Sequence, residues 1–350
     1  MKFVDRKHEQ ERLTRLLSGD VPAFAIIRGR RRVGKSTLIK RILKEADVYF
    51  EADRTDKETQ MSNLSYVLSH TFPGFNDAQY KDWRALLTAL NHRVTAKITL
   101  CLDEFPYLVE SDSSLPSVIQ NLLDSEELKY NIILCGSSQT MMYNLTHEQS
   151  SPLYGRKEAD FNIRPIKLPF LQEALGLTAE ETIENYAVWG GIPRYWRLRE
   201  SSASLMDSVN GHIMSTMGAL YEEPQSLFQD DFKDIVKTST IMTIVGGGAN
   251  RLKEIAGRCN EPATNLSRPL AKLIDLGYLE KDIPFGVSAK DTKKSLYRIA
   301  DPFLFFHYKF VPANRSFIEL GRTALINGIL ESRLPELTGY WRERLTRDAV

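Results

Sequence analysis

The sequence is poor in cysteine and has no cysteine pair at close spacing. Its three cysteines, Cys101, Cys135 and Cys259, lie far apart, with no C-x-x-C pair and no histidine at metal-ligand spacing. This pattern argues against a disulfide framework and against a cysteine-based zinc site. It favours a reducing environment, and we expect a cytoplasmic protein.

Long apolar runs and a charge excess of one sign are also missing. Residues 1–7 become charged before an apolar signal region could form, and no stretch approaches roughly 18 uninterrupted apolar residues. We therefore expect neither a signal peptide nor a membrane partner. Lysine and arginine number 46 against 45 aspartate and glutamate, a formal net charge of +1, so any basic surface must be local.

The chain does contain a regular alternation of short apolar runs with amphipathic segments. Its 350 residues and 42% hydrophobic content allow two or three domains with substantial cores. The spacing predicts strands at 24–27, 48–50, 98–102, 132–135 and 161–168, with helical segments between them. Because parallel strands need crossover connections, this order predicts an α/β fold with a mainly parallel sheet and helices on both faces.

A glycine-containing loop follows the first predicted strand and precedes a helical pattern. Residues 29–36 fit the phosphate-loop motif G-x-x-x-x-G-K-S/T without a mismatch. The glycines let backbone N–H groups point at a phosphate, Lys35 adds a catalytic charge near the β and γ oxygens, and Ser36 offers a hydroxyl to Mg²⁺. The predicted ATP-binding residues are Gly29, Arg30, Arg31, Arg32, Val33, Gly34, Lys35, Ser36 and Thr37. The three loop arginines are either solvated or steer the nucleotide by charge, and we assign them no chemistry.

Two carboxylates, Asp103 and Glu104, end the third predicted strand. This position is the carboxyl edge of the sheet, where open α/β sheets bind their ligands. We expect Asp103 to hold Mg²⁺, directly or through water, and Glu104 to polarise the attacking water. The alternative is a pair of solvated acids that begin a loop.

Four further residues are considered as candidates for catalysis. Ser137 or Ser138, after the fourth predicted strand, can place a hydroxyl near the γ-phosphate or the water, or the two serines merely cap the next helix. Arg156 and Arg194 are candidates to stabilise transition-state charge, in cis or across a subunit interface. An ordinary surface or structural role is the alternative for each arginine.

These motifs, in this order, resemble the archaeal-type ATPases among the STAND and AAA-like P-loop proteins. The resemblance extends from Phe3 to about residue 310. It depends on Phe3-Val4-Asp5-Arg6 with Glu9 and Leu13, the phosphate loop, Leu102-Asp103-Glu104, Cys135-Gly136-Ser137-Ser138, Leu153-Tyr154-Gly155-Arg156 and Gly190-Gly191-Ile192-Pro193.

The resemblance implies an ATPase core whose acidic strand is not the immediate neighbour of the phosphate-loop strand. A small helical domain, a winged helix and a C-terminal nuclease-like domain follow in that family. We therefore divide the chain into an ATPase core at 1–170, a helical subdomain at 171–245, a winged helix at 246–300 and a partial C-terminal segment at 301–350. The last segment leaves no room for a complete nuclease centre, so no nuclease activity is assigned to it.

The segment 251–298 is the basic part of the sequence. It carries 10 lysines and arginines against 6 acidic residues, a local net charge of +4. Its pattern predicts helix, turn, helix and two extended runs, with Arg268 and Lys272 on the exposed face of the second helix and Lys290, Lys293 and Lys294 in a wing. Such residues suit DNA phosphates, but winged helices also serve as protein docking modules.

Two functions fit these observations. The first is an ATP-driven switch that hydrolyses ATP slowly with Mg²⁺ and couples nucleotide state to the winged helix, with oligomerisation or a protein partner as a further element. The second is a DNA-binding or scaffold protein for which ATP is mainly a structural ligand and hydrolysis is incidental. Glu104 discriminates between them, because only the first function needs turnover.

Overall fold

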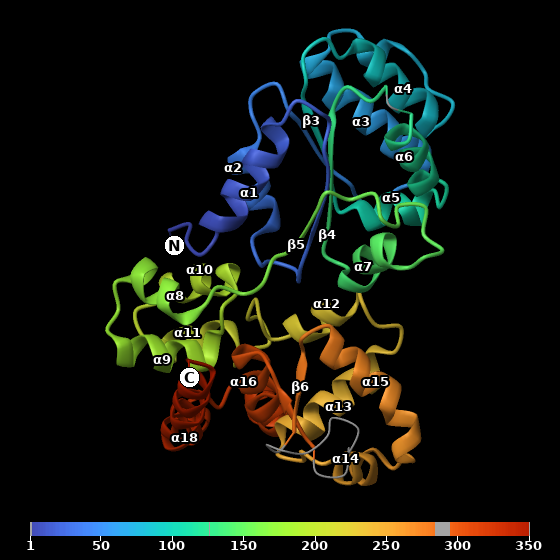
Figure 1. Cartoon of the computed structure of the whole chain (residues 1–350). Coiled ribbons are helices and arrows are strands. Elements are labelled where there is room, and N and C mark those ends of the chain that lie inside the picture. The colour runs from blue at the N-terminus through green and yellow to red at the C-terminus, as the bar shows by residue number, and fades with distance from the viewer. Residues whose placement is uncertain (1, 126, 284–294, 350) are drawn as a thin grey trace. The chain divides into compact units, whose positions relative to one another are not determined.

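The computed structural model describes residues 2–125, 127–283 and 295–349 (Figure 1). The chain divides into two compact units. The first comprises residues 5–164, and the second comprises residues 1–4 and 165–350. No helix in the described part of the chain is long and apolar enough to cross a membrane.

The first unit is built on a five-stranded parallel sheet with the order β2-β3-β4-β1-β5. The central strands β3 (Thr99–Asp103) and β4 (Asn131–Gly136) are buried along their whole length, which explains their continuous apolar sequence. β1 (Phe24–Arg28) lies between β4 and β5 (Ala159–Asn162), and β2 (Val48–Glu51) forms the other edge. The acidic strand β3 is therefore separated from β1 by β4, as the family resemblance implied.

The fifth predicted strand was placed too late in the sequence. β5 is Ala159–Asn162, whereas residues 161–168 were expected. Its partner β1 ends at Arg28, and the last bond between the two segments runs from Ile163 N to Arg28 O (2.7 Å). Beyond Ile163, β1 therefore offers no further residues for pairing. Lys167 already caps the next helix, α8 (Leu168–Leu175).

Helices cover both faces of this sheet, as predicted (Figure 1). One face carries α1 (Lys7–Ser18) and α2 (Lys35–Ile42). The other carries α3 (Lys57–Thr71), α4 (Trp83–Arg93), α5 (Phe105–Ser111) and α6 (Leu115–Leu123), with the short η1 (Phe75–Asp77) next to α3. α7 (Gln139–His147) follows β4.

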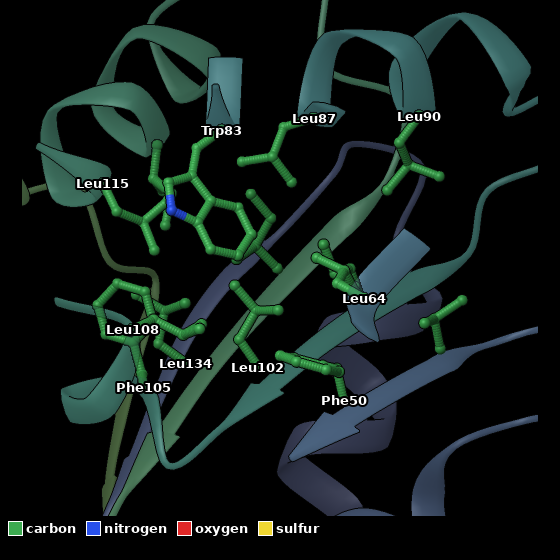
Figure 2. Packing of buried hydrophobic residues seen from close by; sticks show 14 of the residues in the cluster. Phe50, Leu64, Trp83, Leu87, Leu90, Leu102, Phe105, Leu108, Leu115 and Leu134 are labelled. Carbon is green, nitrogen blue, oxygen red and sulfur yellow. The ribbon is translucent and has the colours of Figure 1, made fainter. Parts of the chain in front are cut away.

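The core of the first unit lies between the sheet and α3 to α6. Alternate strand residues such as Phe50, Leu102 and Leu134 point into it and meet Leu64 and Trp83 from the helices (Figure 2). The opposite set of alternate residues, including Asp103, faces the side of α2. Because the pleat sends successive side chains to opposite faces, this core fixes which strand residues reach the phosphate loop.

The second unit is mostly helical. Its helices after α8 are α9 (Ala179–Trp189), α10 (Pro193–Glu200), α11 (Leu205–His212), α12 (Glu223–Phe228), α13 (Ile235–Gly246), α14 (Leu252–Cys259), α15 (Ala263–Asp275), α16 (Pro302–Phe310), η3 (Pro312–Asn314), α17 (Arg315–Glu319) and α18 (Thr323–Ala349). β6 (Leu279–Asp282) and β7 (Leu296–Ile299) form an antiparallel hairpin. α9 packs against α16 and α18, and α13 packs against α14 and α16.

The glycines of Gly190-Gly191-Ile192-Pro193 have a structural function in this unit. Gly190 ends α9 with φ of +61°, a conformation that favours glycine. A Cβ on Gly191 would lie 2.3 Å from the carbonyl oxygen of Ile166, so only glycine fits there. The proposed subdivision of residues 171–350 stays a prediction.

Candidate nucleotide-binding site

The phosphate loop connects β1 to α2 and has glycine at two positions where the backbone favours it. Gly29 and Gly34 have φ of +151° and +101°. A Cβ on Gly29 would lie 2.3 Å from the carbonyl oxygen of Ile163. Val33 is fully buried and anchors the loop in the interior of the first unit. The motif therefore folds locally as the sequence predicted.

Lys35 lies inside the loop. It is the first residue of α2, is only 6% exposed, and donates from Nζ to the carbonyl oxygens of Gly29 (3.0 Å) and Arg30 (3.3 Å). This position keeps the cation at the centre of the loop, beside the N-terminus of α2. Both the charge and the helix N–H groups favour a bound phosphate.

The three loop arginines differ in their surroundings. Arg30 is 6% exposed, so the interpretation that it is solvated is wrong. Arg31 is half-buried and donates to the hydroxyl of Tyr107 (3.3 Å). Arg32 is exposed and has φ of +66°, and Thr37 is exposed in the first turn of α2.

Asp103 meets Ser36 at the carboxyl edge of the sheet. Asp103 is 1% exposed, and its Oδ2 accepts hydrogen bonds from Ser36 Oγ (2.7 Å) and from the hydroxyl of Tyr49 (2.6 Å). Its Oδ1 accepts from the Glu104 N–H (2.9 Å). The two residues predicted to hold Mg²⁺ therefore lie together. Tyr49 was missed, because only the β2–β3 register brings it beside the acidic strand.

Asp103 is ionised despite its burial. Burial alone would raise its pKa, but hydrogen bonds from Cys135, Tyr49, Ser36 and the Glu104 N–H together hold the pKa below its ordinary value. Burial and the bond to Asp103 raise the pKa of Tyr49 far above its ordinary value, so this phenol is a neutral donor.

Glu104 lies next to Asp103 but in a different environment. It is half-buried and caps α5 with a left-handed backbone, φ of +50°. Its Oε2 accepts from the Ser137 N–H (3.1 Å) and from Ser137 Oγ (2.9 Å). The two strand ends thus bring Glu104 and Ser137 together, as their positions after β3 and β4 suggested.

The two serines after β4 have different contacts. Ser138 caps α7, since its side chain accepts from the Met141 N–H (3.4 Å). The capping alternative is therefore correct for Ser138. Ser137 instead contacts Glu104, as described above.

Arg156 lies at the wrong edge of the sheet to act on the nucleotide of its own chain. It precedes β5, and the Glu158 N–H donates to the carbonyl oxygen of Phe24 at the start of β1 (3.0 Å), whereas the phosphate loop follows the end of β1. Its guanidinium forms two bonds with the Asp124 carboxylate, at 2.8 and 2.9 Å. The prediction of a role in cis is wrong, and a role across a subunit interface stays a prediction.

Arg194 belongs to the second unit. It is an exposed residue in the first turn of α10, three residues after Gly191, whose backbone packs on Ile166. Its proposed catalytic role stays a prediction.

The residues at the sheet edge fit a magnesium ion better than a protein-enclosed metal. No group of three or more histidine, cysteine, aspartate or glutamate side chains within the described ranges has a geometry suited to a metal. Mg²⁺, however, commonly binds one or two protein oxygens together with phosphate oxygens and waters. Ser36 Oγ and Asp103 Oδ2, which lie 2.7 Å apart, provide such a pair of oxygens.

Comparison with known proteins identifies a sequence relative and solved structures with a similar fold. A Methanocaldococcus jannaschii protein, the uncharacterized protein MJECL04, is 29% identical over 323 residues, which are 91% of this chain and 71% of that protein. The Walker-type ATPase PABY2304 of Pyrococcus abyssi has a similar fold, with a TM-score of 0.65 and 19% identity over 88% of this chain and 96% of its own. The ORC2 protein of Aeropyrum pernix, solved as ADPNP–ADP complexes, gives a TM-score of 0.57 and 15% identity over 92% and 96% of the two chains.

At these identities the two solved structures show the shared fold alone. The family model for an ATPase domain predominantly from Archaea matches residues 3–197, more than half of the chain. The matched range includes the phosphate loop, Asp103, Glu104 and Ser137. The chain belongs to this family of archaeal ATPase domains.

Proposed function

We propose that this protein binds Mg·ATP and hydrolyses it, and that the nucleotide state acts as a switch. The observation that carries the proposal is the 2.7 Å contact between Ser36 Oγ and Asp103 Oδ2, which joins the phosphate loop to the acidic strand. Lys35 directly precedes Ser36 at the N-terminus of α2, and Glu104 directly follows Asp103. Phosphoryl transfer needs this combination of charge, metal site and base.

Each residue has a defined task in this proposal. Lys35 and the α2 N–H groups hold the β- and γ-phosphates, while Ser36 and Asp103 hold the metal, which supplies positive charge to the phosphate oxygens. Glu104 accepts a proton as the water oxygen bonds to the γ-phosphorus and the bond from that phosphorus to ADP breaks. ADP and phosphate are the products. The nucleotide state is in turn coupled to residues 246–300.

Two substitutions test binding and hydrolysis separately. Lys35→Ala should remove most of the affinity for Mg·ATP, because the triphosphate keeps its charge while the loop loses its cation. Glu104→Gln should keep that affinity and lose hydrolysis, because an amide cannot accept the proton. Calorimetry and phosphate release measure the two properties. Undiminished binding by Lys35→Ala, or normal turnover by Glu104→Gln, would refute the assignment.

The same variant separates the switch from a scaffold with incidental hydrolysis. If Glu104→Gln abolishes the biological output as completely as Lys35→Ala does, turnover is required. If the output survives in Glu104→Gln but not in Lys35→Ala, the protein needs only to be occupied by nucleotide.

DNA binding by residues 251–298 is a second proposal, and one part of it needs correction. α15 buries Leu266, Leu270 and Leu273 and leaves Arg268 exposed, which suits a helix that contacts DNA. Lys272, however, donates to the carbonyl oxygen of Asp231 and lies 4.9 Å from the centroid of the Phe232 ring. The prediction that it faces outward is therefore wrong. Lys290, Lys293 and Lys294 lie outside the described residues.

Salt dependence tests this second proposal. Labelled duplexes titrated at several salt concentrations should bind less tightly as salt rises, because each neutralised phosphate releases counterions. The triple substitution of Lys290, Lys293 and Lys294 by alanine should flatten the slope of log K against log salt by up to about 0.9 per lost contact. Arg268→Ala should change base preference more than the slope, if that side chain contacts a base. No binding at low salt, with and without nucleotide, would favour docking of a protein partner instead.

A further inference from the structure

Tyr49 provides a side chain at the sheet edge that no motif accounts for. It lies on β2, where Val48 and Phe50 point into the core and Tyr49 points to the opposite face. The register pairs Tyr49 with Cys101 and Glu51 with Asp103, so the phenol reaches forward to the end of the acidic strand. Its hydroxyl donates to Asp103 Oδ2 at 2.6 Å, the same oxygen that accepts from Ser36 at 2.7 Å.

The ring of Tyr49 is held from the side of the phosphate loop. Lys40, on α2, places its Nζ 4.3 Å from the centroid of the ring. The hydroxyl also lies 3.3 Å from Glu51 Oε2, a weaker second acceptor. Tyr49 thus contacts both the helix that begins at the phosphate loop and the strand pair that carries Asp103.

The chemistry of metal binding gives this contact a function. When Ser36 Oγ binds Mg²⁺ through a lone pair, the position of this hydroxyl depends on the metal as well as on Asp103. The phenol hydroxyl does not need to move, because it approaches Asp103 from β2 rather than from the phosphate loop. It therefore keeps the carboxylate in the orientation in which an oxygen faces the metal or a metal-bound water.

We propose that Tyr49 is a positioning residue for magnesium, which acts by holding the Asp103 carboxylate. This inference rests on the proposed function, because it presupposes that Ser36 and Asp103 form the metal site. Tyr49 itself need not touch nucleotide or metal. Its loss should therefore weaken the effect of Mg²⁺ on nucleotide binding and leave the binding of metal-free nucleotide intact.

The test measures nucleotide binding rather than turnover. Full-length wild type and Tyr49→Phe are titrated with a fluorescent ATP analogue, first in EDTA and then over a range of Mg²⁺ concentrations. In EDTA the two proteins should bind alike. The Mg²⁺ concentration that gives half of the affinity gain should rise about tenfold in Tyr49→Phe, the size expected for a lost hydrogen bond to a charged group.

Two further variants serve as controls. Tyr80→Phe removes a phenol of the same unit that donates to the carbonyl oxygen of Phe75 (2.9 Å), and it should keep the wild-type Mg²⁺ requirement. Glu51→Gln removes the negative charge of the second acceptor while the bond from Tyr49 to Asp103 remains, and it too should keep that requirement. Circular dichroism confirms that each variant is folded at the assay temperature.

The outcomes separate the inference from the function on which it rests. If wild-type protein binds no nucleotide, or gains nothing from Mg²⁺, the proposed function fails. If wild type responds to Mg²⁺ and Tyr49→Phe has the same requirement, or loses affinity equally with and without metal, the positioning role is overturned. An equal shift in Glu51→Gln would assign the effect to charge at the end of β2 instead.

Discussion

At the scale of single residues, the site separates two neighbouring carboxylates by their hydrogen-bond donors. Asp103 is almost inaccessible to solvent and accepts hydrogen bonds from Ser36, Tyr49, Cys135 and the Glu104 N–H, which suits a fixed ligand. Glu104 is half-buried and has both of its Ser137 bonds on one oxygen, Oε2. Under the proposed function, its Oε1 would therefore be the atom that accepts the proton from water. Adjacent positions in the sequence thus have different environments, which suit the different tasks that we propose for them.

A substitution of Ser137 tests this division. Ser137→Ala removes the hydroxyl donor to Glu104 and should lower kcat about tenfold, because a hydrogen bond to a charged group that orients the base is lost. The affinity for Mg·ATP should not change. Single-turnover hydrolysis and calorimetry measure the two quantities, and Ser137→Thr should restore most of the rate.

Ser138→Ala is the matched control. It removes the cap of α7 and should lower the free energy of unfolding by about 1 kcal/mol without changing kcat. If Ser137→Ala hydrolyses ATP at the wild-type rate, Ser137 does not orient Glu104.

At the scale of elements, side-chain hydrogen bonds to Asp160 of β5 hold the end of β1 just before the phosphate loop begins. Arg28 Nε donates to Asp160 Oδ1 (2.9 Å), and Lys157 Nζ donates to Asp160 Oδ2 (2.6 Å). All three side chains are less than one-fifth exposed. Burial alone would raise the pKa of Asp160, but Lys157 and Arg28 hold it below its ordinary value.

The low pKa of Asp160 gives a pH-dependent prediction. A carboxyl group whose pKa is lower in the folded state stabilises the fold above its unfolded value, 3.8, and this stabilisation is lost as the pH falls through the folded value. Asp160→Asn should therefore cost about 1 to 3 kcal/mol at pH 7 and progressively less below pH 4. Urea unfolding at several pH values measures the difference.

Asp124→Asn provides the comparison on the protein surface. Like Asp160, Asp124 accepts two hydrogen bonds from basic side chains, in this case both from Arg156. Its side chain is 48% exposed, so Asp124→Asn should lower the free energy of unfolding at pH 7 much less. Equal losses for the two variants would show that the burial of Asp160 has no bearing on stability.

The sequence predicts the elements of the first unit better than their partners. Strands β1 to β4 follow from apolar runs, and residues 29–37 follow from a motif whose spacing is fixed by local backbone geometry. The contacts of Tyr49 with Asp103 and of Arg28 with Asp160 depend on which strands are neighbours and in which register. No local pattern contains that information. Lys272 shows the same limit, because helical spacing does not show that Asp231 and Phe232 lie beside it.

At the scale of the whole molecule, both units bury titratable groups, and the burial of one of them in the second unit has a consequence in mild acid. The first buries Asp103 with donors that favour its charge. The second buries His307 on α16, with Nε2 2.8 Å from the carbonyl oxygen of Tyr221 and the ring 6.0 Å from that of Phe303. Burial lowers the pKa of His307 from 6.5 to about 4. The second unit therefore contains a buried neutral histidine whose protonation in mild acid favours unfolding.

The sign of this effect follows from proton uptake. As the pH falls below 6.5, the unfolded chain protonates His307 while the folded unit does not until about pH 4, so protons favour unfolding. The second unit should lose up to about 3 kcal/mol of stability from this histidine between pH 6.5 and pH 4. His307→Gln keeps a donor for Tyr221 without a titrating ring, and it should lack this loss.

The measurement can follow the second unit alone. The four tryptophans are Trp83 in the first unit and Trp189, Trp196 and Trp341 in the second. In a Trp83→Phe background, tryptophan fluorescence during urea unfolding therefore reports the second unit. As the pH falls from 7 to 4, we expect the free energy of unfolding of His307→Gln to rise relative to that of the wild type. A gap that is independent of pH would show that His307 is protonated equally in the folded and unfolded states, and that its burial does not govern the acid stability of this unit.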